Sequence, residues 1–167
     1  MTIKFSRSEL LEMALSMERN GIAFYQALAN ETQNKDSKAI YDYLAGEEEK
    51  HMNTFQGMLN TVGQYQPPED STREYMLFLQ NIVAPAVFPN ITAVQRRAEK
   101  MSSEIETIDT AIQAEKNSIL FYIEMQNFVK QPDQQTVLNI MNAEKAHLVQ
   151  LSQLKETLEI RNQSPDC

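Results

Sequence analysis

Two short motifs contain the only two histidines of this 167-residue chain, and each places a glutamate three residues before its histidine. The motifs are Glu48-x-x-His51 and Glu144-x-x-His147. Residues three apart lie on one face of a helix, so the carboxylate and the imidazole of each motif can reach a common ion. Carboxylate oxygens and imidazole nitrogens, with no thiolate, suit iron or manganese better than a structural zinc ion. The two motifs therefore predict a metal site.

A lone glutamate precedes each motif, within an internal repeat. The segment MERNGIAFY in the first half matches AEKNSILFY in the second, so Glu18 is followed by Tyr25 at the same spacing as Glu115 by Tyr122. Both tyrosines fall on the apolar face of the predicted helices. Their hydroxyls could hydrogen-bond a ligand carboxylate or supply an electron or a proton, and a core aromatic ring with a satisfied hydroxyl is an equally simple interpretation.

The four glutamates interrupt the apolar faces of four predicted helices. Apolar residues recur every three to four positions in each, which indicates a helix with one buried face, and the acids Glu18, Glu48, Glu115 and Glu144 fall on that face. Glu47 and Glu49 are rotated by about 100° to either side of Glu48 and can reach solvent. Burying four carboxylates costs on the order of several kcal/mol each. Two divalent cations would neutralise their combined charge.

Capping signals and hydrophobic periodicity predict an all-α fold. Starts are indicated by Ser6 with Glu9, Asp36, Ser103 with Glu106, and Asp133. The predicted helices cover residues 6–32, 36–62, 103–130 and 133–160. They form two antiparallel helical hairpins joined by a long crossover, as in four-helix bundles with one long connection. We expect one domain over residues 1–161 and a flexible tail over 162–167.

The crossover, residues 64–102, contains the most apolar stretch of the chain, YMLFLQNIVAPAVF. A short helix is predicted over residues 71–83, before Pro85 and Pro89 interrupt it. The stretch is too short to span a bilayer. It is expected to cover one end or side of the bundle, with a partner contact as the alternative.

Composition excludes several classes of protein. The formal net charge of −8 disfavours a nucleic-acid partner. The single cysteine, Cys167, allows no intrachain disulfide, and the sequence pattern predicts neither a secretion signal nor a membrane-spanning segment. We therefore expect a cytoplasmic protein.

Taken together, the motifs resemble those of the rubrerythrin and bacterioferritin group of the ferritin-like superfamily. The resemblance covers residues 6–62 and 103–160 and rests on E…FY, EEKH, EKNSILFY and AEKAH. It implies a ferritin-like four-helix bundle that binds two iron ions, with manganese or zinc as substitutes. It also implies that Glu48 and Glu144 bridge the ions, that Glu18 and His51 complete one shell, and that Glu115 and His147 complete the other.

The resemblance further implies an oxidoreductase that reacts with dioxygen or hydrogen peroxide and cycles by two electrons. Rubrerythrins proper carry a C-terminal rubredoxin domain with four cysteine ligands, and this sequence has a single cysteine. We therefore expect ferrous iron or a separate donor protein, such as a rubredoxin, to supply electrons. They also carry a further glutamate where this chain has Ser118, and Gly21 is the equivalent in the first half. A homodimer is expected. The alternatives are a metal-binding or iron-storage protein without turnover and a non-catalytic interaction module.

Overall fold

Four α-helices form the part of the chain that the structure, a computed structural model, describes: residues 6–62, 103–126 and 129–163. They are α1 (Arg7–Glu31), α2 (Lys35–Asn60), α5 (Glu104–Gln126) and α6 (Asp133–Gln163). No strand occurs within these residues, so the predicted all-α fold is confirmed. The short helix expected within 64–102 lies outside the described residues.

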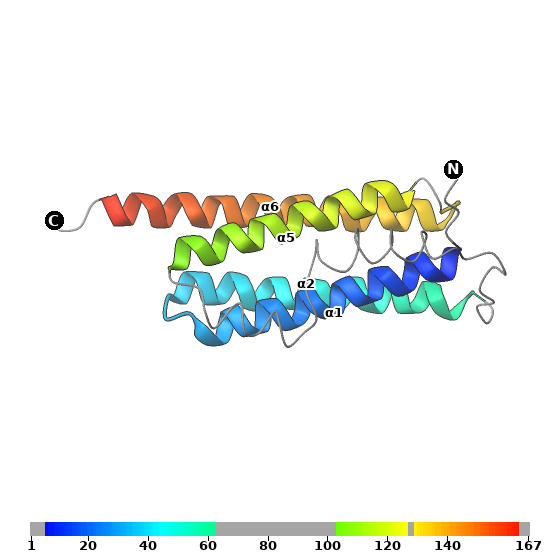
Figure 1. Cartoon of the computed structure of the whole chain (residues 1–167), viewed down its shortest axis with the longest axis horizontal. Helices are drawn as coiled ribbons and strands as arrows, with labels where there is room; N and C mark the ends of the chain where they lie inside the picture. Colours follow the sequence, from blue (N-terminus) through cyan, green and yellow to red (C-terminus); the bar gives the residue numbers. More distant parts are fainter. Residues whose placement is uncertain (1–5, 63–102, 127–128, 164–167) are drawn as a thin grey trace, which may run out of the picture.

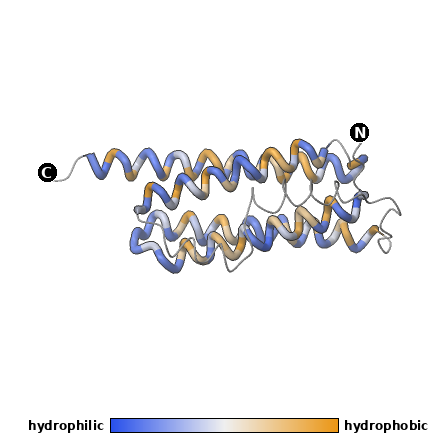
Figure 2. Tube along the Cα trace, viewed as in Figure 1, coloured by the Kyte–Doolittle hydropathy of each residue, from blue (hydrophilic) through white to orange (hydrophobic). Residues whose placement is uncertain are grey.

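The helices pair as two hairpins. α1 packs along α2 and α5 along α6, and the hairpins meet through α2 with α6 and α1 with α5 (Figure 1). Hydrophobic and hydrophilic residues alternate along every helix in Figure 2, as expected when each helix buries one face. The pairing of α1 with α2 and of α5 with α6 confirms the predicted arrangement of two hairpins. None of the helices described is long and apolar enough to cross a membrane.

The first helix begins where its sequence predicts, and the second begins earlier. The Ser6 hydroxyl accepts from the Glu9 backbone N–H while the Glu9 carboxylate accepts from the Ser6 N–H, which completes the predicted capping box. The predicted cap Asp36 is wrong, because Asn34 Oδ1 accepts from the N–H groups of Asp36 and Ser37. Asn and Asp are almost equally good caps, so residue type does not decide between them.

The second hairpin also departs slightly from its predicted limits. Ser103 Oγ accepts from the Glu106 N–H at the start of α5, as the predicted cap requires. α6 continues to Gln163, so the first two residues of the tail expected over 162–167 are helical. The sequence of α6 contains no glycine or proline that would end the helix before Gln163.

Polar contacts tie the hairpins together at both ends. Arg7 of α1 forms an ion pair with Asp133 at the start of α6. At the other end, the Ser37 hydroxyl of α2 donates to Glu104 Oε1 of α5 over 2.5 Å. These contacts fix how the hairpins face each other, and so fix the positions of side chains between them.

The core consists of two apolar clusters with a polar layer between them. One cluster includes Leu11, Leu15, Phe55, Met125 and Ile140, and the other includes Leu28, Tyr41, Leu44, Ile108 and Leu151. Apart from Asp133 at the start of α6, the buried charged residues lie at mid-length of the helices, between these clusters. The bundle therefore encloses its ionisable groups in apolar surroundings.

Candidate metal centre

All six residues predicted to bind metal come together in the polar layer. Each is buried, and they are Glu18, Glu48, His51, Glu115, Glu144 and His147. Their ligand atoms form two groups, within each of which all atoms lie no more than 4.8 Å apart. Glu48 and Glu144 belong to both groups.

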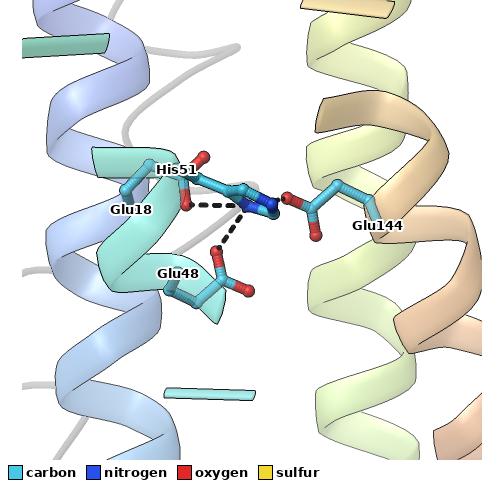
Figure 3. A group of neighbouring side chains, drawn as sticks. All are labelled: Glu18, Glu48, His51 and Glu144. Carbon is cyan, nitrogen blue, oxygen red and sulfur yellow. Dashed lines mark ion pairs between the residues drawn. The ribbon is translucent and has the colours of Figure 1, made fainter. Parts of the chain in front are cut away.

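The first group surrounds His51. Its Nδ1 atom lies 2.9 Å from Glu144 Oε1, 3.6 Å from Glu48 Oε2 and 3.8 Å from Glu18 Oε2. Figure 3 shows the imidazole between Glu18 and Glu48 on one side and Glu144 of α6 on the other. Three helices thus supply one compact set of three carboxylates and an imidazole.

The second group surrounds His147. Its Nδ1 atom lies 3.3 Å from Glu144 Oε2, 3.7 Å from Glu48 Oε1 and 3.9 Å from Glu115 Oε2. Glu48 and Glu144 therefore each direct one oxygen towards each histidine. The two imidazoles lie 5.7 Å apart between ring centroids, at an interplanar angle of 21°.

Several buried atoms of the cluster lack a hydrogen-bond partner. Within the described part of the chain these include His51 Nδ1, Glu115 Oε2 and Glu144 Oε1. His51 Nδ1 and Glu144 Oε1 are only 2.9 Å apart yet do not have hydrogen-bond geometry. Atoms that point at a common third atom rather than at each other show this pattern. Four carboxylates and two imidazoles are also a suitable donor set for two divalent cations, so the residues fit a dinuclear site.

The ionisation of the cluster reflects four crowded carboxylates. Burial and the neighbouring Glu48 raise the pKa of Glu18 well above its ordinary value. Burial and the charges of Glu144 and Glu48 do the same to Glu115. Burial alone lowers the pKa of His51, but the close carboxylates of Glu144 and Glu48 outweigh burial and raise that pKa to about 10. These raised pKa values mean that Glu18, Glu115 and His51 hold protons, which the binding of cations would displace.

Two tyrosines connect the hairpins crosswise. Tyr122 of α5 donates its hydroxyl hydrogen bond to Glu18 Oε1 of α1, and Tyr25 of α1 donates to Glu115 Oε1 of α5. Burial, followed by these carboxylates, raises the pKa of both phenols. Each tyrosine therefore stays a hydrogen-bond donor and orients the carboxylate of the opposite hairpin. Both tyrosines are thus buried aromatic rings whose hydroxyls are satisfied, and the acceptor in each case is a carboxylate of the cluster.

The two glutamates beside Glu48 stay outside the cluster. Glu47 Oε1 accepts from Lys50 Nζ over 2.5 Å, and Glu49 is exposed. The helical register that selected Glu48 from three consecutive glutamates is therefore confirmed.

Some contacts around the cluster had no signal in the sequence. Tyr43 is half exposed, yet its ring lies edge-on to His147 with centroids 6.3 Å apart. Gly21 lies against the Glu48 side chain. Residue type and spacing identify the acids and imidazoles, but contacts such as these depend on how the helices pack.

Comparisons with known proteins agree with this geometry. A crystal structure described as that of a ferritin-like diiron-carboxylate protein from Thermotoga maritima has 28% sequence identity and a TM-score of 0.69, over 93% of this chain and 98% of that chain. The fold is thus a ferritin-like four-helix bundle with a buried carboxylate and histidine cluster. The rubrerythrin family profile matches residues 9–155, and the chain belongs to the rubrerythrin family. No curated protein matches it in sequence.

Proposed function

We propose that this protein is a non-haem diiron oxidoreductase that reduces dioxygen or hydrogen peroxide. The observation that carries the proposal is the pair of buried ligand groups that share Glu48 and Glu144. Membership of the rubrerythrin family supports iron as the metal, as does the diiron-carboxylate description of the Thermotoga maritima protein.

In this proposal, the shared carboxylates of Glu48 and Glu144 would hold both ions. Glu18 and His51 would complete the ligands of one ion, and Glu115 of α5 with His147 of α6 would complete those of the other, in keeping with the two groups that these residues form. Four carboxylates neutralise two divalent cations. The six side chains do not saturate two irons, which leaves positions for a small oxidant.

The bound iron would supply one electron per ion, so that one hydrogen peroxide takes up two electrons and two protons to give two waters. The protein residues would prepare the site for this step. The two apolar clusters keep bulk water from the polar layer, and Tyr25 and Tyr122 hold Glu115 and Glu18 in place. Ferrous iron or a separate donor protein, such as a rubredoxin, would restore the electrons.

Anaerobic protein loaded with two ferrous ions per chain, mixed rapidly with hydrogen peroxide or dioxygen, tests the proposal. We expect oxidation faster than that of free ferrous ion in the same buffer, with one peroxide consumed per two irons. Glu144→Gln is expected to abolish the acceleration, whereas Glu49→Gln, at an exposed neighbour of the cluster, keeps it. Two bound irons oxidised no faster than free iron would identify a binding or storage protein instead. A chain that binds no iron would overturn the site as well.

A further inference from the structure

We infer that Gly21 is a positioning residue for Glu48, because its missing side chain provides the space in which the Glu48 carboxylate lies. This inference rests on the proposed function only where it treats Glu48 as a bridging ligand. The need for a residue without a side chain applies to the first half of the chain only, since the second half has Ser118 at the matching position.

The contacts at Gly21 are unusually close. Gly21 is buried in α1, one turn after Glu18. A Cβ atom added there would lie 3.2 Å from Glu48 Cγ, 3.4 Å from Cδ and 3.6 Å from Oε2. The first distance is tighter than ordinary van der Waals contact, so Glu48 would have to move.

Glu48 cannot move without changing the cluster. Its Oε2 lies 3.6 Å from His51 Nδ1 and its Oε1 lies 3.7 Å from His147 Nδ1. The contact at Cγ is on the stem of the side chain, so relief by rotation carries both carboxylate oxygens with it. Closely packed interiors have no spare volume to absorb such a shift. A side chain at position 21 would therefore disturb the contacts of Glu48 with both halves of the site.

The second half of the repeat shows that helix packing alone does not demand a glycine here. Ser118 follows Glu115 by the same three residues as Gly21 follows Glu18, and it is buried in α5. A glycine in a helix interior is also less favourable than alanine. The requirement for no side chain is thus specific to the half that faces Glu48.

The experiment compares Gly21→Ala with Gly46→Ala and Gly57→Ala. These controls lie within α2, and a Cβ at either would meet nothing within 4 Å. Co²⁺ titration of the full chain gives the affinity and the visible absorption of each bound ion, and thermal unfolding of metal-free protein checks the fold. We expect Gly21→Ala to weaken Co²⁺ binding about tenfold, the size of effect seen when a supporting partner of a metal ligand is lost, and to change the absorption spectrum. The controls should match the wild type in Co²⁺ affinity and absorption spectrum, and they should unfold at the same or a higher temperature, because alanine is more favourable than glycine within a helix.

A second background separates positioning from general packing. Glu48→Ala removes the Cγ, Cδ and Oε2 atoms that a Cβ at position 21 would meet, so the effect of Gly21→Ala on the remaining Co²⁺ binding should shrink towards none in that background. If Gly21→Ala alone does not fold, the double variant should fold and bind Co²⁺ as Glu48→Ala does. The inference is overturned by an unchanged affinity and spectrum in Gly21→Ala, or by an equal loss or continued misfolding in the Glu48→Ala background. Wild-type protein that binds no Co²⁺ would overturn the proposed site and this inference together.

Discussion

The two halves of the internal repeat supply the same residue types to the cluster, but they do not hold them equally. Glu144 lies 2.9 Å and 3.3 Å from the two histidine Nδ1 atoms, whereas Glu48 lies 3.6 Å and 3.7 Å from them. The side chain of His51 is 8% exposed and that of His147 is 2% exposed. The shared carboxylate of the second half therefore lies closer to both imidazoles, and the histidine of that half is more enclosed.

The electrostatics of Glu144 follow from this position. Burial by itself raises its pKa, but hydrogen bonding to His147 and the nearby imidazole of His51 outweigh burial and hold the pKa well below its ordinary value. An ionised Glu144 between two imidazoles is the anchor of the cluster. The internal repeat thus determines which ligands are present, while the neighbours of each ligand determine how firmly it is held.

The largest expected effect comes from removing one shared carboxylate at a time. Glu144→Gln should weaken binding of both ions by more than about 100-fold, beyond the range for loss of a supporting residue, because the shared side chain loses its negative charge and one of the two oxygens that it directs at the ligand groups. Glu48→Gln should cost less, since its oxygens lie farther from both imidazoles. Anaerobic Fe²⁺ or Co²⁺ calorimetry measures the difference, with the exposed Glu49→Gln as control. Equal losses in the two variants would show that the two shared positions are equivalent once metal is bound.

A smaller effect is expected from the lone glutamates, each of which belongs to one ligand group. Glu18→Gln should leave the ion held by Glu115 and His147, and Glu115→Gln should leave the ion held in the other half. Each variant should therefore bind one ion per chain instead of two. Elemental analysis after gel filtration gives the count. Loss of both ions from either variant would mean that the halves fill only together.

The sequence predicted the fold and the members of the cluster because both depend on periodicity. The register of α2 separates Glu48 from its neighbours, and the repeat places Glu144 in the same way. The start of α2 was wrong because Asn34 and Asp36 have almost equal capping preference. Local sequence cannot choose between two residues whose free energies of capping differ so little.

Contacts between the hairpins were beyond the reach of the sequence. Tyr25 and Glu18 share α1, and nothing in their spacing shows that Tyr25 bonds to Glu115 of the other hairpin. The clearance at Gly21 likewise depends on the rotamer of Glu48. Such contacts are set by the relative position of two hairpins that are joined through a long connection, and periodicity within a helix carries no information about that position.

The smallest effect expected is also the most specific, because the tyrosines cross between hairpins. Tyr122→Phe removes the hydrogen bond to Glu18, and Tyr25→Phe removes the one to Glu115. Tyr122→Phe should weaken binding of the ion beside Glu18 about tenfold, and Tyr25→Phe should weaken binding of the ion beside Glu115 to a similar extent. Tyr41→Phe is the matched control, since the buried Tyr41 hydroxyl has no hydrogen-bond partner among the described residues.

The single-ion variants make this crossing measurable. In the Glu115→Gln background, which is expected to keep only the ion beside Glu18, Tyr122→Phe should weaken Co²⁺ binding and Tyr25→Phe should leave it unchanged. The pattern should reverse in the Glu18→Gln background. If each tyrosine instead affected the ion beside the lone glutamate of its own helix, the hydrogen bonds between the hairpins would not be what orients these ligands. The crossed result would show that each half of the site depends on the opposite hairpin for its orientation, and that neither hairpin can hold its ion correctly alone.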